Sequence, residues 1–159
     1  MTPLARRIQM VLASGVINPA LAVTICVMLI NMRRTKIGVA AESKLCKELD
    51  EPPLGLVLPD LSERWNSSLK TSLSEVEHIT PGEPDKISAL VESIELETEQ
   101  VARTKAMKVH GQTHYRFKAN LGACDKCLAD DGKEYPVDEK PSHHPHCKCE
   151  TELIGESDE

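Results

Sequence analysis

The sequence predicts a mainly α-helical fold, in which a helical N-terminal part is followed by a small α+β module rich in cysteine. Three observations support this prediction. Aliphatic residues recur at the spacing of an amphipathic helix through much of the first 100 positions. Aromatic residues make up only 3% of the 159-residue chain, so a core must be aliphatic. Four of the six cysteines lie between positions 124 and 149, together with three of the six histidines.

Charge and proline divide the chain into four segments. Residues 1–36 form an apolar helical segment flanked by arginine pairs, and residues 37–100 form a helical region with proline-rich breaks at 52–59 and 80–84. Residues 101–150 hold a further helix, which is expected to continue weakly to about Asn120, and the cysteine-rich module. The last ten residues carry five acids and no base, so a disordered acidic tail is expected at 151–159.

Three amphipathic helices are expected between residues 37 and 101. The first has an apolar residue at every fourth position and ends before the prolines at 52 and 53. Asp60 and Asp85 can cap the second and third. The three apolar stripes comprise Ile37, Ala41, Leu45 and Leu49; Leu61, Trp65, Leu69, Leu73 and Val76; and Ile87, Leu90, Val91, Ile94, Thr98 and Val101.

Residues 8–32 are 25 consecutive residues without a charge, between two arginine pairs. A helix of this length could span a bilayer. The polar residues Gln9, Asn18 and Asn31 and the helix-breaking Pro19 argue against a span, because lipid offers them no hydrogen-bonding partners. The alternative is a helix buried against other protein subunits. Hydropathy alone does not decide between a membrane span and a helix buried against protein. The cost of placing the polar residues and Pro19 in lipid favours packing against protein.

The cysteine-rich module has the pattern C-x2-C, sixteen residues, then H-x2-C-x-C. Thiolate and imidazole donors at this spacing select tetrahedral Zn²⁺. The predicted ligands are Cys124, Cys127, His144 and Cys147. Cys149 is an alternative to either of the last two, because alternate residues of a strand point to the same side. Between the two ligand groups, Asp131-Gly132 predicts a turn, and the alternation at Tyr135 and Val137 predicts a short strand.

A structural zinc fits this pattern better than a redox or catalytic site. The C-x2-C pair precedes a turn rather than standing in a βαβ unit, as a thioredoxin-like pair would. A catalytic zinc needs an open coordination position and a nearby base, and a surplus of ligands favours a closed site. No Ser–His–Asp set, phosphate loop or carboxylate pair can be identified, so the chain is not expected to be an enzyme. Its net charge of −6 gives it no electrostatic reason to bind nucleic acid.

The cysteine-rich module resembles the C-terminal signature of tailed-phage minor head proteins, the Mu protein F-like or head-morphogenesis family. The resemblance covers about residues 101–150. Lys148 stands where the family usually has arginine, and Arg103-Thr104 is followed by Lys105 in place of the family's acid. Only "KANLGA" stands where the family has a tryptophan-bearing strand, so that strand is expected to be shortened or missing. The residues that match the motif are Cys124, Cys127, Asp131, Gly132, Lys133, Pro136, His144, Pro145, Cys147 and Cys149.

The resemblance implies a non-enzymatic virion component, present in several copies as a minor head or internal protein near the portal. Its expected partners are other virion proteins, and it would lie in the head interior or at the portal vertex after assembly in the host cytoplasm. Residues 8–32 would pack against virion proteins and could contact the host membrane during DNA ejection. The alternative function is that of a membrane-anchored protein whose zinc-knuckle domain binds a partner.

Overall fold

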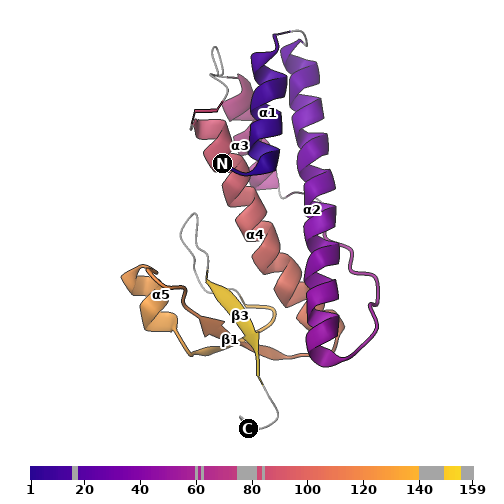
Figure 1. The fold of residues 1–159 in the computed structure, drawn as a ribbon, viewed down its shortest axis with the longest axis vertical. Coiled ribbons are helices and arrows are strands. Elements are labelled where there is room, and N and C mark those ends of the chain that lie inside the picture. The colour runs from indigo at the N-terminus through magenta and orange to yellow at the C-terminus, as the bar shows by residue number, and fades with distance from the viewer. Residues whose placement is uncertain are drawn as a thin grey trace. The chain divides into compact units, whose positions relative to one another are not determined.

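The structure is a computed structural model that describes residues 1–15, 18–59, 61, 63–74, 82–83, 85–139 and 149–154. In these ranges the chain forms a set of helices and a small antiparallel sheet at its C-terminal end (Figure 1), which confirms the predicted fold class. The elements are α1 (Pro3–Ala13), α2 (Pro19–Leu49), α3 (Glu63–Ser74), α4 (Lys86–Val109), β1 (His114–Lys118), α5 (Asp125–Asp130), β2 (Glu134–Pro136) and β3 (Glu150–Leu153).

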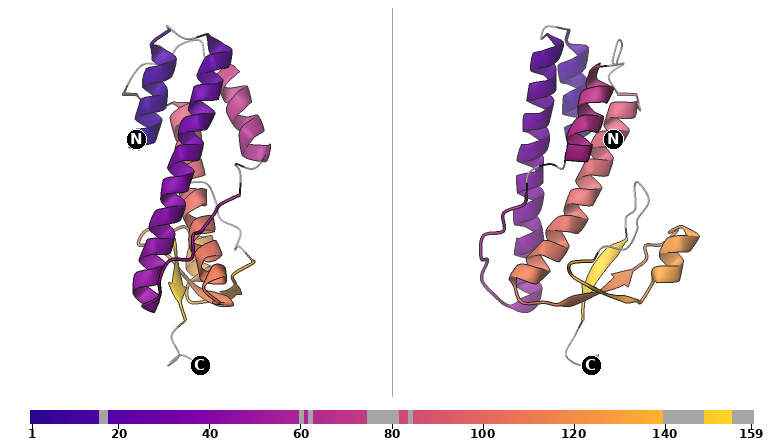
Figure 2. Two further views of the ribbon diagram at one scale, coloured as in Figure 1. Left: turned by 90° about the vertical axis from the view of Figure 1, so that its right-hand side faces the viewer. Right: turned by 180° about the vertical axis from the view of Figure 1, so that it is seen from behind.

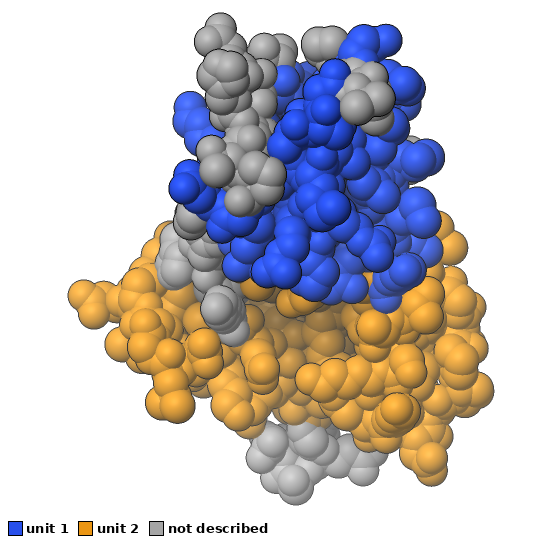
Figure 3. All heavy atoms as spheres, turned by 45° about the horizontal axis from the view of Figure 1, so that its top comes forward, with its two compact units in different colours: residues 1–36, 58–95 blue, residues 37–57, 96–159 orange. Residues whose placement is uncertain are grey.

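The chain folds into two compact units, each made of segments that are distant in sequence. Unit 1 comprises Met1–Lys36 and Leu58–Glu95, and unit 2 comprises Ile37–Val57 and Leu96–Glu159 (Figure 3). The long helices α2 and α4 each contribute one part to each unit. The short helix predicted from Ile37 to Leu49 is therefore the C-terminal part of α2 rather than a separate element.

Unit 1 is a bundle of four helical segments around an aliphatic core. Its members are α1, the first part of α2, α3 and the first part of α4, which lie side by side in both views of Figure 2. The core contains three residues from each of the stripes predicted for the second and third helices. The buried residues of this core are Leu4, Ala5, Ile8, Cys26, Ile30, Leu61, Leu69, Leu73, Ile87, Val91 and Ile94.

The uncharged stretch at 8–32 does not form one helix, so the expectation of a single apolar segment is wrong. Helix α1 ends at Ala13, and Gly15 has a φ of +61°, a conformation that glycine adopts without strain. The Asn18 side chain then accepts the N–H of Leu21 at 2.9 Å, and Pro19 is the first residue of α2. None of the helices in the described ranges is long and apolar enough to cross a membrane.

Asp85 caps α4, as the sequence predicts. Its Oδ1 atom accepts the backbone N–H groups of Ile87 at 2.8 Å and Ser88 at 3.0 Å. These are two of the donors that the first turn of a helix leaves without a partner. The cap predicted at Asp60 lies outside the described residues.

Unit 2 contains a three-stranded antiparallel sheet in the order β2-β1-β3. Tyr115 at its centre pairs with Tyr135 of β2 and with Leu153 of β3. Tyr115 is 1% exposed and packs with buried residues of α2 and α4. That core consists of Leu45, Ala106, Met107 and Tyr115, with Leu49, Leu56, Tyr135, Val137 and Leu153 packed against it.

Two expectations for the C-terminal third are wrong. Helix α4 ends at Val109 rather than near Asn120, because Gly111 takes a φ of +84° and closes the helix. Residues that were expected to continue the helix form β1 instead, which ends at Lys118, the first residue of the "KANLGA" segment. Residues 151–153 of the predicted acidic tail belong to β3, because Leu153 reaches the core of unit 2 and Thr151 pairs with Phe117.

Candidate metal centre

The described cysteines of the C-terminal module lie around α5 and the start of β3. Cys124 occupies the N-cap position of α5, and Cys127 is buried within that helix. Cys149 directly precedes β3 and is also buried. Cys127 and Cys149 belong to one buried cluster with Phe117 of β1. The structure therefore brings one residue of each cysteine pair into the same cluster.

Cys149 has a further contact that suits a metal ligand. The backbone N–H of Asn120 donates a hydrogen bond to its Sγ atom at 3.5 Å. Hydrogen bonds to a ligating group orient it and are a common second layer around metal sites. This contact supports Cys149, the predicted alternative ligand. The predicted ligands His144 and Cys147 lie outside the described residues.

The predicted turn at Asp131-Gly132 is confirmed, and it connects α5 to β2, which pairs with β1. Gly132 has a φ of +80° and its N–H donates to the Phe117 carbonyl at 2.8 Å. The Asp131 carboxylate accepts the N–H of Ala119 at 2.8 Å. The turn thus holds β2 beside β1, close to the buried cysteines. The predicted strand around Tyr135 is β2.

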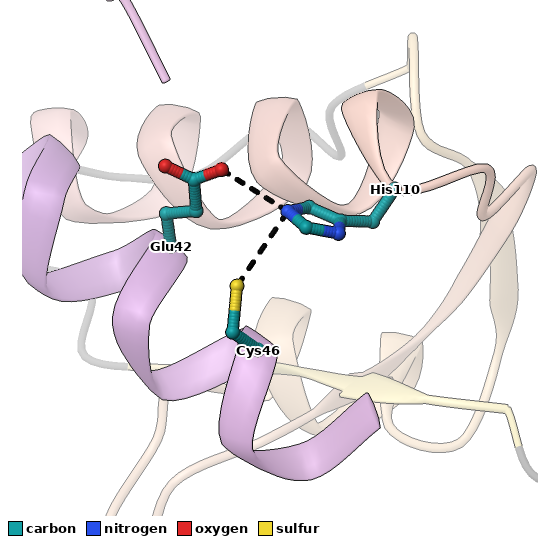
Figure 4. Close-up of side chains that lie close together, drawn as sticks. All are labelled: Glu42, Cys46 and His110. Atoms are coloured by element: carbon teal, nitrogen blue, oxygen red, sulfur yellow. Dashed lines mark hydrogen bonds and ion pairs between the residues drawn. The ribbon is translucent and has the colours of Figure 1, made fainter. Parts of the chain in front are cut away.

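A second set of metal-ligand side chains meets in unit 2, where the sequence showed no motif. Glu42 and Cys46 lie one turn apart on α2, and both point toward His110, which follows α4 (Figure 4). His110 Nε2 lies 3.1 Å from Glu42 Oε1 and 3.6 Å from Cys46 Sγ. All three residues are buried, and their donor atoms lie within 4.8 Å of one another. This group could therefore hold a metal ion.

Two helix ends create this cluster. After α2, Asp50 takes a φ of +55° and the N–H of Glu51 donates to the Cys46 carbonyl at 3.0 Å. After α4, the N–H of Gln112 donates to the Met107 carbonyl at 2.8 Å. Both are hydrogen bonds of the kind that close a helix with one left-handed residue. They bring Glu51 back toward α2 and leave His110 directly after the last residue of α4.

Further hydrogen bonds fix the donor groups of the cluster. His110 Nδ1 lies 2.9 Å from Glu51 Oε2, so both ring nitrogens face carboxylates. The Glu42 oxygens accept the backbone N–H groups of Leu54 at 2.7 Å and Leu56 at 2.8 Å. Glu42 therefore holds the loop after α2 as well as the imidazole.

The surroundings shift the pKa of each member of the cluster. The hydrogen bond to Glu51 raises the pKa of His110, and Glu42 adds to this against the effect of burial. Burial raises the pKa of Glu42, but hydrogen bonds from Leu56, Leu54 and His110 outweigh it and hold that pKa below its usual value. Burial and the nearby carboxylates raise the pKa of Cys46. Without a metal ion, these shifts favour the charged form of the imidazole and of the Glu42 carboxylate, and the neutral form of the thiol.

The directions of these pKa shifts do not favour Cys46 as a nucleophile. A cysteine nucleophile needs a thiolate and a neighbouring histidine that can accept a proton. Here Glu42 already occupies the ring nitrogen that faces Cys46. Metal binding is the chemistry that uses all three side chains together.

Among the described residues, the group of Glu42, Cys46 and His110 is the one set of three potential ligands that lie this close together. The described cysteines of the C-terminal module do not form a second such set by themselves. The assignment of the module's metal ligands therefore rests on the sequence motif. The group of Glu42, Cys46 and His110 cannot be recognised in the sequence, because Cys46 and His110 are 64 positions apart. The only local signals are the spacing of four between Glu42 and Cys46 and the glycine after His110.

Comparison of the chain with known protein families, curated proteins and solved structures finds no match.

Proposed function

We propose that this chain is a non-enzymatic component of a phage virion, a minor head or internal protein near the portal, with one structural zinc in its C-terminal module. The zinc would be bound by Cys124, Cys127 and two of the three donors His144, Cys147 and Cys149. The proposal rests on the resemblance of this module to the minor head proteins. The observation that carries it is the buried cluster of Cys127 and Cys149, which joins the two halves of the motif beside the Asp131-Gly132 turn.

Among the residues that the structure describes, this cluster is small, which supports a structural role for zinc. Phe117, Cys127 and Cys149 are its buried members, with two alanines and Tyr135 packed against them. A core of this size contributes little apolar burial, so an ion that binds only the folded module would add much of its stability. A closed set of thiolate and imidazole ligands would provide this without an open coordination position.

Exposed apolar residues on α2 support a role in protein–protein contacts. Leu21, Met28 and Met32 are 48%, 54% and 53% exposed. Their spacing of seven and four residues places them on one face of the helix. A face of this kind suits packing against another virion protein, the role expected for residues 8–32. The arginines at 33 and 34 are engaged elsewhere, with Glu95 and with the Pro59 carbonyl.

The proposal is tested by following the chain into phage particles. Particles from cells that carry the gene and its neighbours are purified, and the chain is quantified by mass spectrometry against the major capsid protein. We expect a few copies per particle, and a portal gene beside the gene for this chain. Particles that assemble and package DNA without any copy of the chain would contradict the proposal.

The role of the α2 face is tested with two matched variants. Met28→Glu places a charge on that face, and Val57→Glu places the same charge at an apolar residue that is 78% exposed and outside every helix. Both proteins should fold, because neither position is buried. Met28→Glu should reduce incorporation into particles while Val57→Glu leaves it unchanged. Equal incorporation of the two would show that the face makes no contact in the virion.

A further inference from the structure

We propose that Glu42, Cys46 and His110 bind one zinc-type divalent ion at a site separate from the C-terminal cysteines. The three side chains offer a carboxylate oxygen, a sulfur and an imidazole nitrogen, the three donor types that zinc uses in proteins. All three are buried in unit 2. The site is independent of the proposed virion function, because it uses none of the residues on which that function rests.

The two donor distances from His110 Nε2 are close to those of a tetrahedral ion. With zinc–ligand bonds of about 2.0–2.3 Å, neighbouring donor atoms of a tetrahedral site are about 3.3–3.6 Å apart. His110 Nε2 lies 3.1 Å from Glu42 Oε1 and 3.6 Å from Cys46 Sγ. A ring nitrogen has one proton or one lone pair to offer. A hydrogen bond from Nε2 therefore cannot fully satisfy both Glu42 Oε1 and Cys46 Sγ. One cation between the three atoms would satisfy all of them.

The surroundings of the three donors are those of a metal site. Histidine ligands commonly donate their second ring N–H to a carboxylate, and ligating carboxylates are themselves hydrogen-bonded. Glu51 Oε2, 2.9 Å from His110 Nδ1, meets the first condition. The N–H groups of Leu54 and Leu56, which donate to Glu42, meet the second. Glu51 is thus a positioning residue that acts on the ion through His110.

The proposed site is structural. Three protein donors leave one tetrahedral position, which falls to a water molecule. Open positions are typical of catalytic zinc, but here the side chains of His110 and Glu42 are only 0% and 5% exposed. A buried ion in this place would fasten the loop after α2 to the end of α4 within unit 2.

The zinc content of the purified full-length chain tests the proposal. Protein prepared without chelator is measured by elemental analysis and native mass spectrometry. We expect two zinc ions per chain, one in the cysteine module and one here. Cys46→Ser and His110→Gln should each reduce the count to one. Cys26→Ala should keep both ions, because Cys26 is a buried thiol in the core of unit 1.

The remaining outcomes separate this site from the module. A count that neither Cys46→Ser nor His110→Gln lowers would overturn the proposal. If the wild-type chain holds one ion, the Cys124→Ser variant shows which of the two sites binds it. An ion that persists in Cys124→Ser but is lost in Cys46→Ser supports this site and contradicts the module's zinc. The reverse pattern overturns this site and leaves the module's zinc standing.

A second variant keeps the test valid if Cys46→Ser fails to fold. Glu51 is 49% exposed at its side chain, so Glu51→Gln should fold normally. It removes the charge behind His110, and should weaken the affinity for one of the two ions by about 10–100-fold in competition with a chelator. Glu48→Gln is the control, since this glutamate pairs with Arg103 away from the cluster. Unchanged affinity for both ions in Glu51→Gln would overturn the proposal.

Discussion

Gln9 of α1 donates a side-chain hydrogen bond to Asp85, the residue that caps α4, which is 76 positions further along the chain. The same amide nitrogen donates to the Glu83 carbonyl at 2.6 Å, and the amide oxygen accepts the N–H of Gly82 at 3.0 Å. Gln9 is completely buried. A buried polar group is tolerated when it is hydrogen-bonded, which explains a glutamine at the end of an otherwise apolar core.

Replacing Gln9 with leucine should destabilise unit 1. The substitution removes the hydrogen bonds of Gln9 with Asp85, the Glu83 carbonyl and the Gly82 N–H, and each such bond contributes about 0.5–1.5 kcal/mol. Chemical denaturation followed by circular dichroism measures the change. Met10→Ala on the same helix is the control, because Met10 is 61% exposed and should matter little. A Gln9→Leu protein as stable as the control would mean that these hydrogen bonds contribute nothing.

Asp85 should make stability depend on pH in the acidic range. Partial burial raises its pKa, but hydrogen bonds from Gln9, Ser88 and Ile87 outweigh burial and hold the pKa below its usual value of 3.8. A group whose pKa is lower in the folded state stabilises the fold above its unfolded pKa. That stability is lost as the pH falls through the folded value. The loss from Asp85 should therefore begin near pH 4 and continue below it.

Asp85→Asn isolates this contribution from those of the other carboxyl groups. Asparagine is also a good N-cap, so the helix end should stay intact while the titration is removed. Thermal unfolding of both proteins is measured between about pH 2.5 and 6, the range that brackets the usual pKa. The advantage of the parent chain over Asp85→Asn should shrink as the pH falls below 4. A constant difference across this range would show that Asp85 has the same pKa in both states.

The helices could be predicted from the sequence where local signals agree with the pattern of burial. The residue type at position 85 predicts the cap, and periodicity predicts the stripe of Ile87, Val91 and Ile94, all of which are buried. Within residues 8–32, the absence of charge concealed the signals Gly15 and Asn18-Pro19, which end one helix and begin the next. Long-range pairing explains the other errors. The strand at 150–153 is stabilised by β1, more than 30 positions earlier, and acidic composition alone gave no sign of it.

The two candidate metal sites also differ in whether local sequence signals predict them. Cys124, Cys127 and Cys149 belong to a local motif, so their spacing alone predicts a shared metal site. Glu42, Cys46 and His110 come together only because two helices end side by side in unit 2 and each closes with a left-handed residue or glycine. Separations of this size leave no pattern in a single sequence. Such a site becomes visible only in three dimensions.

The cysteine module should lose its zinc when Cys149 is replaced. Cys149 shares a buried cluster with Cys127 and accepts a hydrogen bond from Asn120, so its thiolate is well placed to bind the ion. Cys149→Ser should therefore release one zinc ion, as measured by elemental analysis, while circular dichroism shows little loss of helix. Cys147→Ser is the comparison. If Cys147→Ser loses the ion and Cys149→Ser retains it, the fourth ligand is Cys147 instead.

Cys26 provides the control for this experiment. Burial raises the pKa of Cys26 to about 11, and the residues of its core cluster are apolar side chains that offer no metal ligand. It lies in the core of unit 1 rather than in the module. Cys26→Ala should retain all bound zinc. Zinc loss in this variant would mean that the measured loss follows general destabilisation rather than removal of a ligand.

A charge on α2 should have opposite consequences on its two faces. Val23 is partly buried and packs against the core of unit 1, whereas Met28 is 54% exposed. A glutamate at position 23 would place a charge beside Cys26 and Ile30, where it has little access to water. Val23→Glu should therefore destabilise the chain by about 2 kcal/mol or more, and Met28→Glu should change stability by less than about 0.5 kcal/mol. Urea denaturation of the two variants and the parent chain measures both effects. Equal destabilisation by the two variants would mean that the exposed face of α2 is also buried in solution, for example against a second copy of the chain. If both variants were as stable as the parent chain, α2 would not pack as the structure shows.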